Sequence, residues 1–141
     1  MNDLLKYESL RFNDIVQANF DESYFNLTLK SFIAFKWLSL HFTSDQVQYI
    51  LKVDDDVVVR LDSLLERARD EFDASRVAFY CFEVNGALPN RLRTHKFYLS
   101  YQEYLYDTFP KYCSGSVYIL TYRLLRKITD LDHFMFYMKF E

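Results

Sequence analysis

Strand-like and helix-like segments alternate along this chain, and that alternation limits the folds open to it. Short apolar runs rich in β-branched and aromatic residues predict strands over 47–53 and 76–84. Amphipathic spacing predicts helices over 61–72 and 122–131, and the segment 109–120 joins a proline and a small-residue turn to a further apolar run. The pattern is typical of α/β folds, whose ligands lie at the carboxyl ends of strands.

The first forty residues add a short strand and a long helix. Residues 14–19 predict the strand. Over 23–42, apolar residues sample the i, i+3 and i+4 positions, and the segment is too long for a strand. It therefore predicts a helix, with Asp21 and Ser23 as plausible caps.

The remaining segments are less regular. Asn-Gly and Pro make 85–94 turn-like, and the aromatic stretch 96–104 is compatible with a strand. Thr121 is available to cap the helix that follows it. No linker, low-complexity segment or charge block interrupts the 141 residues, so the sequence predicts one domain.

Composition excludes several classes of protein. Half of the residues are hydrophobic, which allows a buried core, and a net charge of −3 gives no basic footprint for nucleic acid. The chain has 2 glycines where about ten are usual at this length, so no glycine-rich phosphate loop can form. No segment approaches the roughly 20 apolar residues of a membrane span, and the acidic, polar start does not resemble a signal peptide.

Two features bear on the cellular compartment in which the protein folds. Cys81 and Cys113 are the only cysteines, and they form either one disulfide in an oxidising compartment or two buried thiols. Asn26 begins the only glycosylation sequon, which matters only in a secretory protein.

Three consecutive carboxylates follow the apolar run of 47–53. Asp54, Asp55 and Asp56 repel one another unless a cation neutralises them, and they lie where a strand leaves the sheet. Mg²⁺ and Mn²⁺ prefer oxygen ligands and often bind through one or two carboxylates together with substrate phosphates. The alternative is a solvated turn, because aspartate is common at strand ends.

Two enzyme classes use acids in this place. A haloacid-dehalogenase-type phosphatase has D-x-D after an apolar strand, with the first Asp as nucleophile, but that motif opens its domain. Here 53 residues precede it. A GT-A glycosyltransferase has D-x-D in mid-domain, where the acids hold a metal that neutralises the departing diphosphate.

The rest of the chain resembles the β-1,3-galactosyltransferase family, which includes β-1,3-N-acetylglucosaminyltransferases and is distantly related to Fringe. Seven blocks carry the resemblance in the family's order: Glu8, FNDIVQANF (12–20), DESYFNLTLKS (21–31), Trp37, LKVDDDVVV (51–59), PNRLRTHKFYLSYQEY (89–104) and FPKYCSGSVYILT (109–121). Ser116 stands where the family has a second Gly, and Phe97 stands where it has Trp. The resemblance implies a GT-A-like, Rossmann-like α/β fold with a mixed sheet flanked by helices, incomplete at both ends.

The resemblance also implies a donor site. Asp56 would bind Mn²⁺ or Mg²⁺ directly, with Asp54 as the second candidate ligand, and Asp54 or Asp55 would lie near the ribose or a metal-bound water. The other cofactor-binding candidates are Lys30, Tyr112, Ser114 and Gly115, and residues 112–115 would form a turn that lines the sugar or acceptor side of the cleft. Two of these residues have ordinary alternatives, since Asp54 could be a structural acid and Lys30 a solvated helix lysine.

On the acceptor side, Lys96, Tyr98 and Tyr104 would line a cleft in which aromatic faces stack on sugar rings, with ordinary core packing as the alternative for each, above all for Tyr104. Inverting transfer needs a general base. The family supplies it from a Glu-Asp-Val block, whose Glu corresponds to Glu141, with the Asp expected beyond the chain end.

The function implied is transfer of galactose or N-acetylglucosamine from a UDP-sugar to a hydroxyl of a glycan on protein or lipid. The linkage would be β-1,3 and the mechanism inverting and metal-dependent. Family members are type II Golgi membrane proteins with a lumenal catalytic domain. The alternative is a truncated, non-catalytic paralogue that keeps the fold and metal–UDP binding.

Overall fold

The computed structural model describes residues 2–130, which divide into two compact units. Of these residues, 2–43 and 125–130 form the first unit, and Ser44–Leu124 form the second. Within the described part of the chain, no helix combines the length and the apolar character needed to cross a membrane.

The first unit is helical. Helix α1 (Asn2–Phe12), which the sequence did not predict, is followed by the short 3₁₀ helix η1 (Tyr24–Asn26) and by α2 (Leu27–His41). The predicted helix over 23–42 is confirmed, and α2 buries Phe32, Ile33, Phe35 and Ser39. Ser23 occupies the N-cap position of η1, as predicted, but makes no side-chain cap bond. Asp21 is not the cap, and its backbone oxygen accepts from the Asn26 side-chain amide at 2.7 Å.

The predicted strand at 14–19 is also wrong. These residues have no regular secondary structure, and Val16 is 48% exposed. A strand needs a neighbour for its hydrogen bonds, and none of the described segments pairs with this one.

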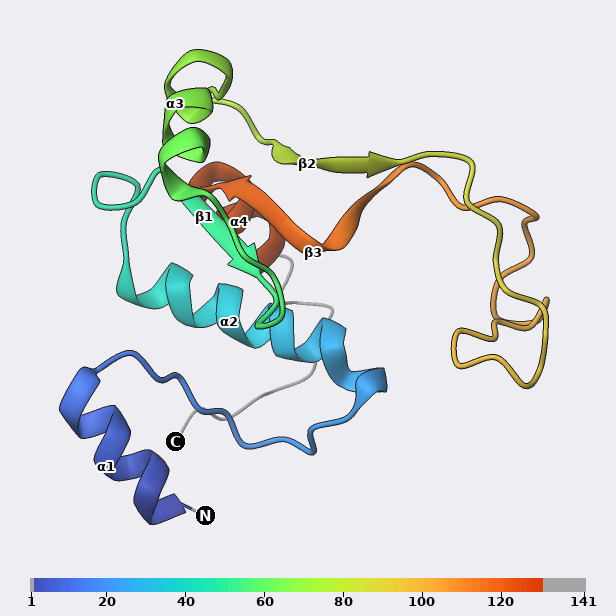
Figure 1. Ribbon diagram of the computed structural model, residues 1–141, viewed down its shortest axis with the longest axis horizontal. Helices are drawn as coiled ribbons and strands as arrows, with labels where there is room; N and C mark the ends of the chain where they lie inside the picture. The colour runs from blue at the N-terminus through green and yellow to red at the C-terminus, as the bar shows by residue number, and fades with distance from the viewer. Residues whose placement is uncertain (1, 131–141) are drawn as a thin grey trace. The chain divides into compact units, whose positions relative to one another are not determined.

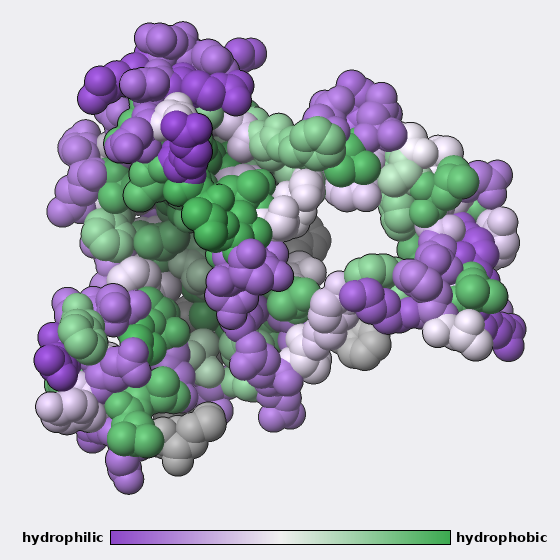
Figure 2. Space-filling view, in the orientation of Figure 1, coloured by the Kyte–Doolittle hydropathy of each residue, from purple (hydrophilic) through white to green (hydrophobic). Residues whose placement is uncertain are grey.

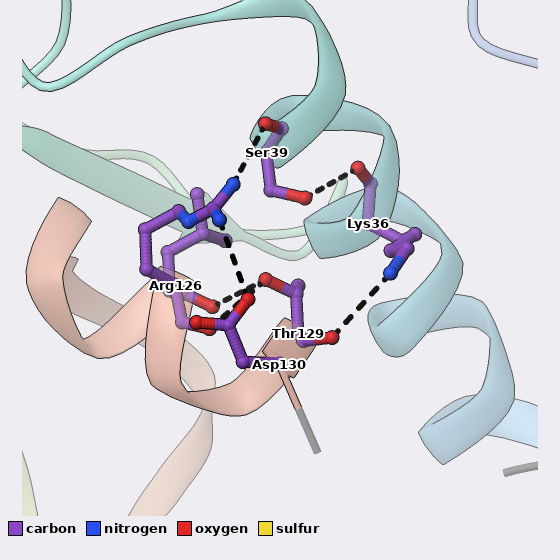
Figure 3. Close-up of polar contacts among 6 residues, drawn as sticks. Lys36, Ser39, Arg126, Thr129 and Asp130 are labelled. Carbon is purple, nitrogen blue, oxygen red and sulfur yellow. Dashed lines mark hydrogen bonds and ion pairs between the residues drawn. The ribbon is translucent and has the colours of Figure 1, made fainter. Parts of the chain in front are cut away.

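Helix α4 (Tyr122–Asp130) confirms the helix predicted over 122–131 and contacts α2 through polar groups (Figure 3). Lys36 Nζ donates to the carbonyl of Thr129 at 3.4 Å, and Arg126 Nη1 donates to the carbonyl of Ser39 at 3.4 Å. Thr129 is almost fully buried, and its hydroxyl donates to the carbonyl of Leu125 at 3.0 Å. The buried polar groups of this contact are therefore hydrogen-bonded, as their burial requires.

The second unit contains a three-stranded sheet (Figure 1). The strands β1 (Tyr49–Val53), β2 (Phe79–Val84) and β3 (Tyr112–Thr121) confirm the strands predicted over 47–53 and 76–84 and in the apolar run of 109–120. Their order is β1-β3-β2, and both pairings are antiparallel, so none of the described strands is parallel to its neighbour. The structure is thus mixed α/β with a small antiparallel sheet.

Helix α3 (Leu61–Glu71) confirms the helix predicted over 61–72. A groove of about 750 Å³ separates α3 from the strands and is lined by Leu51, Phe72 and Ile119, among others. Figure 2 shows a hydrophilic outer surface on α3 and hydrophobic surface beneath it. The apolar residues of the sheet are therefore only partly covered by this helix.

Two local predictions in this unit need correction. The stretch 96–104 is not a strand, since its only ladder contact is a single bridge from Tyr98 to Asn90. The predicted small-residue turn at 112–115 is instead the start of β3, because Tyr112 and Cys113 pair with Val84 and Glu83 of β2. In both segments long-range pairing, or its absence, decided the conformation.

Thr121 joins the sheet to α4, as the sequence predicted. The residue is fully buried, and its hydroxyl accepts from the backbone N–H of Leu124 at 3.2 Å, which is the bond of a helix cap. The same hydroxyl donates to the carbonyl of Arg76 at 2.8 Å and lies 3.3 Å from the N–H of Ala78.

We expect Thr121→Val to lower the free energy of unfolding by about 2 kcal/mol, because valine keeps the shape and leaves these buried backbone groups without the hydroxyl. Urea unfolding followed by circular dichroism measures the change. Thr121→Ser keeps the hydroxyl and is the matched control. Equal losses for the two variants would contradict the importance of these bonds.

Candidate functional site

The three aspartates form a turn at the end of β1. The N–H of Asp54 donates to the carbonyl of Ser116 at 2.9 Å, which extends the pairing of β1 with β3 by one residue. The N–H of Val57 donates back to the carbonyl of Asp54 at 3.2 Å, which closes a β-turn over 54–57. Asp55 and Asp56 occupy the tip of this turn and are exposed.

Lys52 connects the turn to β3. Its ammonium pairs with the Asp54 carboxylate and donates to the carbonyl of Gly115 at 2.6 Å. The ammonium also lies 5.8 Å from the centroid of the Tyr118 ring, within the range of a cation–π contact. Lys52 and Asp54 are two residues apart along an extended chain, so their side chains lie on the same face of the sheet.

The start of β3 adds neutral polar groups beside this pair. The hydroxyls of Ser114 and Ser116 are 3.3 Å apart, and Ser116 is the residue that holds the Asp54 amide. Gly115 has an ordinary backbone conformation, and a Cβ added there would meet no described atom within 4 Å. Neither backbone geometry nor packing against described residues therefore demands glycine at this position.

A divalent cation needs oxygen ligands, which the aspartate turn can supply only in part. Among residues 2–130, no three His, Cys, Asp or Glu side chains gather closely enough to form a metal centre made of protein ligands alone. Asp55 and Asp56 make no ion pair with any described residue. The turn fits a cation that takes one or two carboxylates and completes its coordination with phosphate and water oxygens.

A disulfide closes the base of the long connection between β2 and β3. Cys81 and Cys113 are bonded, so the structure has the disulfide rather than two thiols. Nearby, Lys111 Nζ lies 2.8 Å from the Glu83 carboxylate. The 27 residues of 85–111 leave the sheet after β2 and return to it at β3 (Figure 1). The disulfide and the ion pair both join the two ends of this connection.

Arg91 organises the interior of this connection, which we call the β2–β3 excursion (85–111). Its guanidinium donates to three carbonyls, those of Leu99 at 2.7 Å, Tyr104 at 2.9 Å and Tyr106 at 2.9 Å. It also lies 3.9 Å from the centroid of the Tyr101 ring. The planar, charged guanidinium of Arg91 therefore donates hydrogen bonds to backbone carbonyls that are not paired in a strand or helix here.

All three predicted acceptor residues lie in the excursion, and their environments differ. Lys96 is exposed and lies 4.6 Å from the centroid of the Phe97 ring. Tyr98 is half-buried, and its N–H donates to the carbonyl of His95 at 2.9 Å. Tyr104 packs against Phe109, with ring centroids 5.0 Å apart, and its hydroxyl donates to the carbonyl of Thr108 at 2.9 Å. These contacts match the core-packing alternative for Tyr104.

Glu103 is held beside these residues by Ser100. The Ser100 hydroxyl and N–H both donate to the Glu103 carboxylate, at 2.7 and 2.9 Å. These two bonds, the hydroxyl first, lower the pKa of the Glu103 carboxyl.

Two candidates belong to the first unit. Lys30 is exposed and pairs with Glu22, and this contact lowers the pKa of the Glu22 carboxyl, through the hydrogen bond first and the charge second. Asn26 is half-buried, and its side-chain nitrogen donates to the backbone of Asp21. Glu141, which corresponds to the Glu of the block expected to supply the base, lies outside the described residues.

Sequence reasoning missed two residues of this region. Lys52 and Arg91 both lie in segments that carry the family resemblance, but neither was predicted as a site residue. Lys52 had a usable signal, because a lysine two residues before an acid on a strand shares its face. Arg91 had none, since its carbonyl partners lie eight, thirteen and fifteen residues away in irregular chain.

The profile of the galactosyltransferase family matches residues 1–141. The chain belongs to the galactosyltransferase family. This assignment favours the transferase interpretation of the aspartates over the phosphatase one.

Curated members of the galactosyltransferase family are about 30% identical to this chain. Human lactosylceramide 1,3-N-acetyl-beta-D-glucosaminyltransferase is 30% identical over 127 residues, which is 89% of this chain and 33% of the relative. UDP-GalNAc:beta-1,3-N-acetylgalactosaminyltransferase 1 of Mus musculus is 32% identical over 137 residues, 97% of this chain and 40% of the relative. Beta-1,3-galactosyltransferase 5 of Pan paniscus is 30% identical over 134 residues, which is 95% of this chain and 44% of the relative. The chain therefore spans less than half the length of these relatives.

In this galactosyltransferase-family chain, we expect Arg91→Lys to loosen the β2–β3 excursion. Lysine keeps the charge but lacks the fork, so the free energy of local opening should fall by about 2 kcal/mol. Chymotrypsin, which cleaves after aromatic residues, then cuts within 97–109 faster than in the wild type. Arg93→Lys changes an exposed arginine of the same segment and should leave the rate unchanged. Equal rates for the two variants would contradict this role of Arg91.

Proposed function

We propose that this chain contributes the donor side of a hexosyltransferase that moves galactose or N-acetylglucosamine from a UDP-sugar to a glycan hydroxyl. A β-1,3 linkage formed with inversion is part of the proposal. Its support is the family assignment together with the relatives, which are named as 1,3-linking transferases of N-acetylglucosamine, N-acetylgalactosamine and galactose. The GT-A arrangement remains part of this proposal as well.

The observation that carries the proposal is the turn over 54–57. It presents Asp55 and Asp56 to solvent at the end of β1, and one backbone hydrogen bond holds it against Ser116. Ser114 and Gly115, the proposed donor-side residues of β3, therefore lie next to the aspartates. Open space at Gly115 is compatible with close approach of a ligand to the backbone.

Mn²⁺ or Mg²⁺ is the proposed cofactor. Asp56 would hold the ion, and a second aspartate would bind the ribose or a metal-bound water. When bound, such an ion neutralises negative charge that develops on a departing diphosphate. The protein's own part is to fix the carboxylates on a short turn anchored to the sheet.

The acceptor side is assigned to the β2–β3 excursion, with Lys96, Tyr98 and Tyr104 as the candidates. The general base is proposed to come from the Glu-Asp-Val block whose Glu corresponds to Glu141. The proposed location is the Golgi lumen, on a type II membrane protein, and the Cys81–Cys113 disulfide suits an oxidising compartment.

We expect calorimetric titration to detect UDP binding in the presence of Mn²⁺ and to lose it in Asp56→Ala. The loss follows because the cation would lack its direct ligand. Asp45→Ala removes an exposed aspartate from a different turn of the same unit and should bind as the wild type does. Wild-type chain that binds no UDP with Mn²⁺, or Asp56→Ala that binds it normally, would contradict the donor-site proposal.

A further inference from the structure

Lys52 is surrounded by groups from both sides of the candidate donor site. Its ammonium contacts the Asp54 carboxylate from β1 and the Gly115 carbonyl from β3. The lysine side chain is 28% exposed and that of Asp54 is 44% exposed, so the pair is more shielded than an ordinary surface ion pair. Lys52 also faces Tyr118, its direct cross-strand partner in the register.

The three aspartates are not equivalent in this arrangement. Asp54 has a cation of the protein beside it, whereas Asp55 and Asp56 are exposed and pair with no described residue. A divalent ion that used Asp54 would have to compete with the lysine ammonium for the same carboxylate. A divalent ion on Asp55 and Asp56 would leave the Lys52–Asp54 pair intact.

We propose that Lys52 is a positioning residue: it neutralises Asp54 and ties the aspartate turn to Gly115, so that Asp55 and Asp56 alone are left for a divalent cation. This inference rests on the proposed function and deepens it, since it names Asp55 rather than Asp54 as the second aspartate that binds the divalent cation. Lys52 then has two effects of opposite sign. Its charge opposes binding of a bare cation, while its bridge pre-organises the turn and the start of β3 for a nucleotide.

The opposite signs give a test that loosening of the structure alone would not reproduce. Calorimetry measures Mn²⁺ alone and then UDP at saturating Mn²⁺, on wild type and on Lys52→Met, which keeps most of the apolar stem. Mn²⁺ alone should bind about fivefold tighter, the scale of one charge acting on a divalent ion in a screened, solvated site. UDP should bind about tenfold weaker, because ordering the turn then costs binding energy. A purely structural lysine would weaken both.

Two further variants separate charge from fold. Lys52→Met combined with Asp54→Asn removes both charges of the pair, so Mn²⁺ alone should bind with wild-type affinity. If Asp54 were a ligand of the ion, this double variant would bind Mn²⁺ more weakly. Lys52→Arg keeps the positive charge and should leave the affinity for Mn²⁺ alone unchanged, even if Lys52→Met does not fold.

The outcomes distinguish the two proposals. Mn²⁺ binding that is unchanged or weaker in folded Lys52→Met, or weaker in the double variant, overturns the role given to Lys52. Tighter Mn²⁺ binding in Lys52→Arg overturns it too, because the charge is retained there. Absence of UDP binding by the wild type contradicts the donor-site proposal instead, since the measurements with Mn²⁺ alone do not depend on the nucleotide.

Discussion

The antiparallel pairing of β1 with β3 fixes the position of Lys52 and Asp54 against the start of β3. Lys52 stands opposite Tyr118, and one hydrogen bond beyond the ladder sets Asp54 against Ser116. Since side chains alternate along a strand, this register places Lys52 and Asp54 on one face while Leu51 faces the other way, toward the groove under α3. A shift of one residue would move the lysine and the aspartate away from their present partners and bring apolar side chains into their place.

Elements whose signal is local could be predicted from the sequence. The helices over 27–41 and 61–71 follow from spacing along one face, and the capping role of Thr121 follows from its place before a helix. Elements that depend on a distant partner could not. Residues 14–19 have strand-like composition and no described partner, while the small residues at the start of β3 suggest a turn but pair with β2. The local sequence does not contain that information.

The candidate site likewise has features that could be predicted from the local sequence and features that could not. Three adjacent aspartates stand out in the sequence because their mutual repulsion needs an explanation. The turn that carries them is closed by a local hydrogen bond between residues three positions apart, Asp54 and Val57. Their unequal environments were not visible, because Lys52 reaches the Gly115 carbonyl across 63 positions of the chain. The contacts of Tyr104 show the converse, since a residue suggested by a family motif is largely engaged in packing.

The cross-link between Cys81 and Cys113 has a consequence for how such a protein can change. It closes the β2–β3 excursion at its base, where the excursion meets the sheet, and Arg91 holds the excursion together from within. In a loop closed at its ends, doubling the length costs only about 0.6 kcal/mol of closure entropy. Substitutions or insertions at the outer end of the excursion therefore disturb the aspartate turn very little. The surface assigned to the acceptor is free to diversify, while the part assigned to the donor keeps its geometry.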